Sequence, residues 1–314
     1  MRITICRDFD IINTFLKDNF SSPTHWPDWN CAVSKYFHSD FFYYILEDNG
    51  TVKGVCPIHR EKHNGLIDNI TGKKEYLLPY GGWILSENID IPLTGATGFN
   101  SAFLGFSLPE LSEFKVSYSP DNTAGYDTLI LDLRLSEDEI WQNCIESKRR
   151  NMIRKAEKSG ITIVQYDLND VTQFYSWLKE VNDRYGLAKF GIEFFQDLFA
   201  TAVNISFTVL LAMLGEEALS AVVLVNDKNY AIYWLGFTVE GSPNAGQGEL
   251  LQWDAIKRAK NAGCRYYDLC TIEKDRLPHI YDFKKDFSKQ EIRFLSFSSR
   301  SFSYKLRNRI ARWI

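Results

Sequence analysis

The chain has 314 residues, which is more than a single average domain usually contains and suggests two domains of about 150 residues each. Hydrophobic residues make up 45% of the sequence and aromatic residues 15%, which excludes an intrinsically disordered protein. A net charge of −4 excludes a protein whose entire surface binds a polyanion, so only the location of the basic residues can indicate such a partner.

The sequence indicates neither a membrane-spanning segment nor a metal site. The N-terminus has no long apolar run, and no stretch of eighteen uncharged apolar residues occurs in the chain. The six cysteines contain no CxxC pair, which argues against a zinc ribbon and against a redox motif. We therefore expect a cytoplasmic protein with reduced thiols, no metal and no bound cofactor.

Short apolar segments separated by turn residues indicate a mixed α+β domain in the first half. The predicted elements are a strand at 2–6, two helices, strands at 41–47, 51–59 and 76–85, a helix around 95–106, and strands at 114–119 and 126–133.

The stretch KRRNMIRKAEKSG at 148–160 contains six basic residues and one acidic residue. Ser136 and Glu139 form a capping-box pattern before it, and Gly160 is a typical helix stop, so we predict one helix over 136–160. Apolar residues recur along this helix at helical spacing, which leaves the basic residues on its other faces. A solvated face and a nucleic-acid surface are both compatible with this pattern.

The second half gives a clearer order of elements. The predicted elements are a strand at 161–167, helices at 170–186 and 192–203, an antiparallel meander of strands at 207–214, 218–225 and 230–237, a helix at 249–263, a strand at 264–270, a helix at 277–287 and a strand at 291–297. This order resembles the GCN5-related N-acetyltransferase (GNAT) fold, and the first half repeats it in degenerate form. We predict an α+β protein with two tandem GNAT-like domains, at 1–135 and 161–298, a basic connecting helix at 136–160 and a basic amphipathic tail at 299–314.

Four stretches resemble the FemABX family of peptidyltransferases, which add amino acids to peptidoglycan precursors from aminoacyl-tRNA. They are WNCAVSKYF at 29–37, PYGGW at 79–83, the basic stretch at 148–161, and GCRYYDL at 263–269 followed by YDFKKDFSKQ at 281–290. The chain has no room for the coiled-coil arm of some family members, so it is similar to the armless kind.

The resemblance implies a catalytic role for Lys284, which matches the lysine of the family's FKxxF motif. A cation at this position would stabilise the oxyanion that develops when an amine attacks an activated acyl carbonyl. Phe283 and Phe287 lie four residues apart and would pack on one helical face beside this lysine.

The resemblance also implies residues that bind the acceptor and the donor. Those matched to the acceptor are Lys35, Arg184, Tyr185, Tyr233 and Trp234. Those matched to the donor are Arg149, Arg150 and Arg154 on the basic helix, together with Gly246 and Gly248 of the G-x-G before Glu249. The position of a family tyrosine is Ala188 here, which leaves the acceptor open, and the G-x-G is compatible with a bare turn as well as with a pyrophosphate loop.

No general base is assigned from the sequence. Asp268, Glu273, Asp275 and His279 are the ionisable residues near Lys284 in sequence. A carboxylate such as Asp268 at a strand end more often accepts hydrogen bonds from backbone N–H groups than it transfers protons. Substrate-assisted proton transfer, which the resemblance implies, requires no enzyme base.

The tail at 299–314 has five basic and no acidic residues, interleaved with apolar ones. Docking onto the protein and peripheral contact with the inner face of the cytoplasmic membrane, where lipid-linked precursors occur, are both open.

Together these features favour an aminoacyltransferase that moves an aminoacyl group from aminoacyl-tRNA to an amine of a nucleotide- or lipid-linked cell-envelope precursor. The alternatives are an acyl-CoA-dependent N-acyltransferase acting on an amino sugar or polysaccharide precursor, and a non-catalytic protein that binds RNA or membrane. Either enzyme would take its donor, the acceptor end of aminoacyl-tRNA or acyl-CoA, as a co-substrate.

Overall fold

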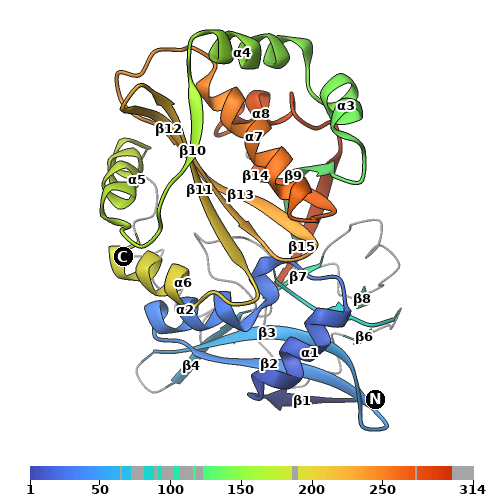
Figure 1. The fold of residues 1–314 in the computed structure, drawn as a ribbon. Helices are drawn as coiled ribbons and strands as arrows, with labels where there is room; N and C mark the ends of the chain where they lie inside the picture. Colours follow the sequence, from blue (N-terminus) through green and yellow to red (C-terminus); the bar gives the residue numbers. More distant parts are fainter. Residues whose placement is uncertain are drawn as a thin grey trace. The chain divides into compact units, whose positions relative to one another are not determined.

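The computed structural model describes residues 1–63, 66–71, 81–87, 91–92, 102–105, 116–117, 123–185, 190–272 and 274–298 (Figure 1). The chain divides into two compact units. Unit 1 contains Met1–Asp127 and Ile292–Ile314, and unit 2 contains Thr128–Glu291. Both combine helices with largely antiparallel sheets, which confirms the predicted α+β class.

Unit 1 is built on an antiparallel sheet with the strand order β1-β2-β3-β4, in which β5 also pairs with β3. Its elements are β1 (Arg2–Cys6), α1 (Phe9–Asp18), the 3-10 helix η1 (Pro23–His25), α2 (Pro27–Phe37), β2 (Asp40–Asp48), β3 (Thr51–His63), β4 (Leu66–Thr71) and β5 (Ile84–Leu85). The central strand β2 is buried along most of its length, as its run of apolar and aromatic residues predicts.

A buried polar network connects the helices of unit 1 to its sheet. The Nδ1 atom of His25 lies 2.9 Å from the hydroxyl of Ser22, and the Tyr43 hydroxyl donates to the His25 carbonyl at 2.7 Å. The Asn30 side-chain oxygen lies 3.0 Å from Nε2 of His59. Buried polar groups stabilise a fold only when they are hydrogen-bonded, so this network fixes how η1 and α2 pack on β2 and β3.

The buried His25 should make the stability of unit 1 depend on pH. Burial lowers the pKa of His25 from 6.5 to about 4, and backbone hydrogen bonds offset only part of this effect. Between these values the unfolded chain binds a proton that the folded chain does not. The stabilisation is therefore complete above pH 6.5 and is lost as the pH falls toward 4. The loss should reach about 3 kcal/mol.

Hydrogen exchange of the β2 amides, corrected for the intrinsic exchange rate, measures this loss in unit 1 itself. The His25→Gln variant should lose less stability on acidification than the wild type. His279→Gln, at an exposed position of unit 2, is the matched control. Equal pH dependence in the wild type and His25→Gln would contradict the assignment.

Three short strands complete the described part of unit 1: β6 (Ile91–Pro92), β7 (Ala102–Gly105) and β8 (Val116–Ser117). β6 pairs in parallel with β8, and β7 pairs antiparallel with β15 (Glu291–Ser298). The prediction of a helix around 95–106 is therefore wrong at 102–105. Pairing with a strand almost 200 residues away overrides the local apolar pattern there.

Unit 2 contains the strand order β10-β11-β12-β13-β14-β9. Its strands are β9 (Thr123–Asp132, which crosses the unit boundary), β10 (Thr162–Gln165), β11 (Ser206–Leu214), β12 (Glu217–Asn226), β13 (Tyr230–Thr238) and β14 (Tyr266–Ile272). The helices that follow in chain order are α4 (Ser147–Lys158), α5 (Thr172–Tyr185), α6 (Ile192–Thr201), α7 (Gln247–Asn261) and α8 (Pro278–Lys284). Strands β11 to β13 form an antiparallel meander, which confirms the prediction, and β10 pairs antiparallel with β11.

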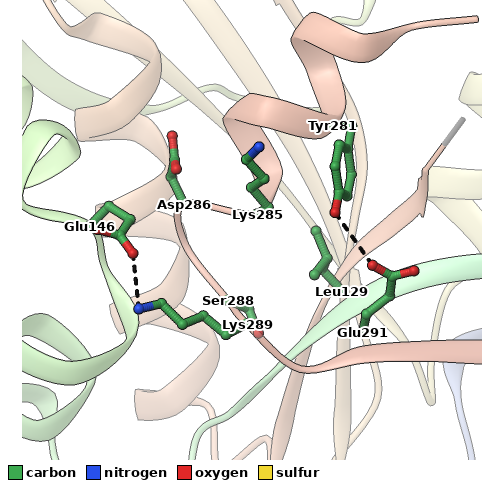
Figure 2. A pocket seen from close by; sticks show the side chains of 8 residues that line it. All are labelled: Leu129, Glu146, Tyr281, Lys285, Asp286, Ser288, Lys289 and Glu291. Carbon is green, nitrogen blue, oxygen red and sulfur yellow. Dashed lines mark hydrogen bonds and ion pairs between the residues drawn. The ribbon is translucent and has the colours of Figure 1, made fainter. Parts of the chain in front are cut away.

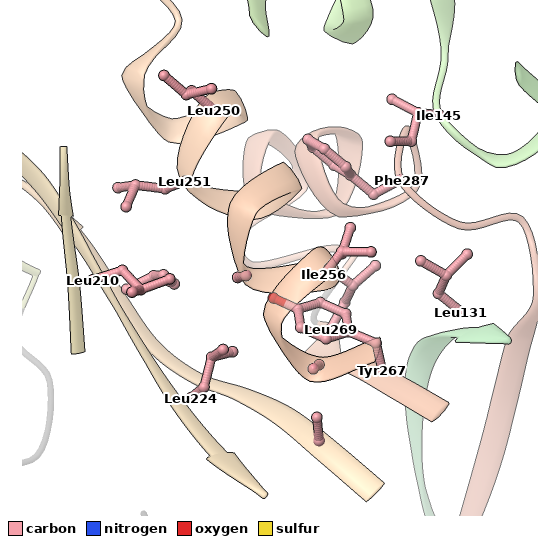
Figure 3. Close-up of a cluster of buried hydrophobic side chains, with 14 of the residues drawn as sticks. Leu131, Ile145, Leu210, Leu224, Leu250, Leu251, Ile256, Tyr267, Leu269 and Phe287 are labelled. Carbon is pink, nitrogen blue, oxygen red and sulfur yellow. The ribbon is translucent and has the colours of Figure 1, made fainter. Parts of the chain in front are cut away.

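The sheet of unit 2 is covered on both faces (Figure 1). On one face α7 packs over β11 and β12 through Leu210, Leu224, Leu251 and Ile256, all of which are at most 2% exposed (Figure 3). On the other face α5 and α6 pack against β11 and β13 through an aromatic cluster. Its members are Phe174, Phe194, Phe195, Phe199, Phe207, Trp234 and Phe237. Burial on both faces explains why these strands are almost continuously apolar.

The single helix predicted over 136–160 is two separate helical segments. The capping box at Ser136 and Glu139 is present and begins α3 (Glu137–Glu139), which continues as a π-helical segment at Ile140–Cys144. Ile145 is then extended, with φ −88° and ψ 124°, and α4 begins at Ser147. Two sets of hydrogen bonds stabilise the break. The Glu146 N–H donates to the Asp286 carbonyl, and the Arg150 guanidinium donates to carbonyls at the end of the π-helical segment.

Within the described residues, no helix has both the length and the apolar character needed to cross a membrane. The predicted amphipathic tail at 299–314 lies outside the described residues.

Candidate active site

The candidate site lies where β13 and β14 stop pairing. Their parallel pairing covers Tyr230–Ile232 against Tyr266–Asp268. Directly after this region, a register shift between β12 and β13 leaves Trp234 as an extra residue in β13, opposite the Val223–Leu224 step. Bulges of this kind redirect side chains and are common beside active sites.

Lys284 comes to this point from the last turn of α8. Its side chain is buried, with 8% exposure, and its Nζ atom lies 3.5 Å from the Cys270 carbonyl oxygen. Nζ also lies 5.7 Å from the centre of the Tyr233 ring, which is within the range of a cation–π interaction. The ammonium group therefore contacts groups of both β13 and β14.

Tyr233 provides an aromatic surface and retains its proton. Burial raises the pKa of Tyr233 to about 12, so its hydroxyl is neutral at physiological pH and cannot act as a base. A Cβ atom at position 236 would lie 2.0 Å from the Tyr233 hydroxyl oxygen, so a residue larger than glycine would displace this ring. This glycine makes room for the ring that faces Lys284.

Asp268 has a structural environment at the end of the paired region. It is fully buried and accepts hydrogen bonds from the Thr128 hydroxyl, from the Tyr230 hydroxyl at 2.8 Å and from the Cys270 N–H at 2.7 Å. The geometry agrees with the expectation that this carboxylate binds backbone N–H groups.

The neighbouring Lys285 points elsewhere and forms an ion pair with Asp282. It lines a polar pocket of about 240 Å³ within unit 2, whose lining also includes Leu129 (Figure 2). The charges of this pocket are paired, since Lys289 binds Glu146 at 2.9 Å. Adjacent lysines of the same motif thus face different environments, and only Lys284 reaches the end of the β13–β14 pairing.

Arg149 is held by two carboxylates of unit 2. Its guanidinium donates to Glu249 at 2.7 Å and to Asp286 at 2.9 Å, and it stacks over the Phe283 ring with 4.9 Å to the ring centre. The Phe283 ring packs against the Phe287 ring, with 5.2 Å between the ring centres, as their spacing predicts. These contacts join α4, α7 and the end of α8 around one partly buried cation.

The other two arginines of α4 have different surroundings. Arg150 donates to the carbonyls of Trp141, Gln142 and Ile145, and so satisfies the end of the π-helical segment. Arg154 is exposed and lies over the Trp141 ring. The basic stretch therefore consists of residues that support the fold and residues that face solvent.

The start of α7, at the G-x-G, lies against α4. Gly246 has φ +88°, and a Cβ atom there would lie 2.2 Å from the Met152 carbonyl oxygen. Glu249 in the first turn is only 8% exposed and binds Arg149. Gly248 lies beside the Phe283 ring, with 4.0 Å from its ideal Cβ position to the ring. The Met152 carbonyl and the Glu249 carboxylate thus both lie at this helix N-terminus.

Replacing Gly246 with alanine should destabilise unit 2 by at least about 2 kcal/mol, because it adds a left-handed conformational cost to a clash with α4. Gly160→Ala is the matched control, since Gly160 has φ +77° but no atom within 4 Å of its ideal Cβ position. It should lose only the conformational part, about 1 kcal/mol. Urea unfolding measures both values, and equal losses would show that the contact with Met152 is unimportant.

Comparison with known proteins identifies the fold. Residues 147–285 match the family described as acetyltransferase (GNAT) domain. No curated protein matches the sequence. Among solved structures, FemX superposes with a TM-score of 0.66 at 14% sequence identity, covering 98% of this chain and 99% of FemX.

The C-terminal domain of a putative lysylphosphatidylglycerol synthetase from Agrobacterium fabrum gives a TM-score of 0.55 at 13% identity, covering 97% of this chain and 96% of that one. L-PGS from Bacillus licheniformis gives 0.53 at 11% identity, with 98% and 97% covered. Residues 147–285 thus match a GNAT acetyltransferase domain, and the chain has a FemABX-like tandem GNAT fold.

The remaining predicted site residues have different surroundings. Trp234 points to the opposite face of the sheet, where its ring centre lies 5.9 Å from that of Phe195 in α6. Lys35 is exposed in the last turn of α2, in unit 1. Arg184 and Tyr185 end α5, and their side chains lie outside the described residues, as do Ala188 and Glu273. Their roles stay predictions.

Sequence reasoning missed the contribution of Cys270, whose left-handed backbone (φ +64°) places its carbonyl beside Lys284. It also missed Thr128, the partner of Asp268 from 140 residues away. No local sequence signal marks either residue. Asp275 and His279 are exposed. Across the described ranges, no cluster of three or more His, Cys, Asp or Glu residues is arranged to hold a metal ion.

Proposed function

We propose that the protein transfers an aminoacyl group from aminoacyl-tRNA to an amine of a peptidoglycan-type envelope precursor. The carbon–nitrogen bond forms as the acceptor amine attacks the ester carbonyl, and the ester bond to the tRNA oxygen breaks. The amine loses its proton, and that ester oxygen gains one. The ammonium group of Lys284 stabilises the oxyanion of the tetrahedral intermediate, which is worth about 3 to 4 kcal/mol for a well-placed group.

Proton transfer in this proposal relies on the substrate. Asp268 accepts three hydrogen bonds inside the core, and Tyr233 keeps its proton, so neither is a suitable base. The side chains at the site bind and orient the reacting groups and supply a positive charge for the oxyanion.

The groups around the α7 N-terminus support aminoacyl-tRNA as the donor. An acyl-CoA donor places a pyrophosphate at such a helix start, where backbone N–H groups and the helix dipole attract an anion. Here the Met152 carbonyl packs against Gly246, and the Glu249 carboxylate already lies in the first turn. A second anion at this place would meet that carboxylate, which favours aminoacyl-tRNA. The similarity in fold to FemX and to a lysylphosphatidylglycerol synthetase agrees with an envelope component as acceptor.

An acyl-CoA-dependent N-acyltransferase is the second candidate. One observation favours it: the match of residues 147–285 to a GNAT acetyltransferase domain.

Calorimetry with acetyl-CoA, and separately with a charged acceptor-stem mimic of tRNA at low salt, separates the two candidates. We expect saturable binding of the RNA only, and salt should weaken it. Saturable binding of acetyl-CoA with no binding of the RNA would reject the proposal in favour of the second candidate.

The exposed cations of α4 allow a sharper version of this test. Arg154→Gln combined with Lys158→Gln should weaken RNA binding and lower its salt slope by about one per cation removed. Lys179→Gln combined with Lys228→Gln removes the same charge from exposed positions outside α4 and is the matched control. Equal losses in both double variants would argue against RNA binding on α4.

A further inference from the structure

Asp268, Cys270 and Lys284 form a chain of contacts that begins in the core and ends at the candidate site. The fully buried carboxylate of Asp268 is fixed by two hydroxyl donors, Thr128 on β9 and Tyr230 on β13. Its third donor is the Cys270 N–H, two residues further along β14. The carboxylate thus connects three neighbouring strands at the point where the β13–β14 pairing ends.

Cys270 has an unusual backbone for its residue type. It has φ +64°, in the left-handed region that non-glycine residues rarely adopt. An aspartate side chain that accepts a hydrogen bond from the N–H two residues later forms a local Asx turn. The Asp268–Cys270 bond therefore anchors the N–H of the residue that adopts the left-handed conformation.

The consequence of the turn is the position of the Cys270 carbonyl. This oxygen lies 3.5 Å from Lys284 Nζ, and the centre of the Tyr233 ring lies 5.7 Å from the same atom. If Cys270 left the left-handed region, its carbonyl would rotate and Lys284 would lose its contact with this oxygen.

We propose that Asp268 is a positioning residue for acyl transfer: it holds Cys270 in the left-handed turn and so fixes the place of the Lys284 ammonium group. This inference rests on the role proposed above for Lys284. Asp268 does not touch the reacting atoms, and it differs from a general base in that its effect passes through the Cys270 backbone.

Three variants test this relation. Asp268→Ala removes the acceptor of the turn. Cys270→Val leaves Asp268 in place but adds a β-branched side chain that resists positive φ. Asp268→Ala combined with Cys270→Gly removes the acceptor and supplies a residue that adopts the left-handed turn without it.

Transfer is measured with an acceptor-stem mimic charged in turn with alanine, serine, glycine and lysine, and with a nucleotide-linked peptidoglycan precursor as acceptor. Asp268→Ala and Cys270→Val should each lower kcat about 10- to 100-fold at a nearly constant KM for the donor. Adding Cys270→Gly to Asp268→Ala should restore kcat at least about tenfold, because the turn forms again. Each rate is expressed per folded protein, measured by circular dichroism in the same sample.

Crystal structures of the wild type and the variants give a readout that needs no substrate. In Asp268→Ala we expect Cys270 to leave the left-handed region and Lys284 Nζ to move away from the Cys270 carbonyl. An unmoved turn in Asp268→Ala overturns the proposal, and so does a loss of kcat that Cys270→Gly leaves unrepaired. Wild-type protein that transfers none of the four amino acids rejects the proposed function instead, while the structures still decide whether Asp268 holds the turn.

Discussion

Replacing Lys284 with methionine should lower kcat about 10²- to 10³-fold, the loss expected when one preorganised oxyanion-stabilising group is removed. Methionine keeps most of the buried stem and removes only the charge, so the protein should stay folded. Steady-state transfer assays measure kcat and KM separately. We expect kcat to fall and KM for the donor to change little, because the interaction exists mainly in the transition state.

Lys285→Met is the matched control for this variant. Lys285 belongs to the same motif but pairs with Asp282 and lines the polar pocket shown in Figure 2. It should keep activity within about threefold of the wild type, since substitutions at exposed positions usually have small effects. Full activity of Lys284→Met would show that Lys284 does not stabilise the oxyanion.

Replacing Arg149 with methionine should destabilise the protein by about 3 to 5 kcal/mol, the range for removing one partner of a buried ion pair. The side chains of Glu249 and Asp286 are only 10% and 4% exposed, and both would lose their hydrogen bonds to the guanidinium. Lys148 still pairs with Asp286, so the larger part of the loss should come from Glu249. Urea unfolding monitored by circular dichroism measures the change.

Two comparisons make this prediction specific. Arg154→Met removes an exposed arginine of the same helix and should cost less than about 0.5 kcal/mol. Arg149→Met combined with Glu249→Gln removes the uncompensated charge and should recover part of the lost stability. If Arg149→Met were as stable as the wild type and lost RNA binding, Arg149 would be a donor-binding residue and not a structural one.

The sequence predicted the fold well where local patterns decide it. The meander of unit 2 is confirmed because turn residues separate apolar runs that are buried on both faces, and Phe283 and Phe287 pack together as their spacing predicts. The helix over 136–160 was predicted without its break. The contacts that end it come from Asp286, about 140 residues away, and from Arg150 turned back on its own chain.

The site was predictable only in part, for the same reason. The FKxxF motif predicts a catalytic role for Lys284, and its side chain lies at the end of the β13–β14 pairing. The partners of Arg149 lie 100 and 137 residues away in sequence, so its basic stretch alone could not separate a structural cation from a phosphate-binding one. Successive side chains of a strand point to opposite faces of the sheet, so Tyr233 and Trp234 lie on different faces, although both were predicted to bind the acceptor.

Product formation tests the central claim most directly. Purified protein is incubated with the nucleotide-linked precursor and one donor, which is either a charged acceptor-stem mimic or acetyl-CoA in separate reactions. Mass spectrometry then measures the mass of the precursor. We predict a gain of one aminoacyl group from the RNA donor, absent in Lys284→Met and present in Lys285→Met. A gain of one acetyl group from acetyl-CoA, with none from the RNA donors, would contradict the proposed function.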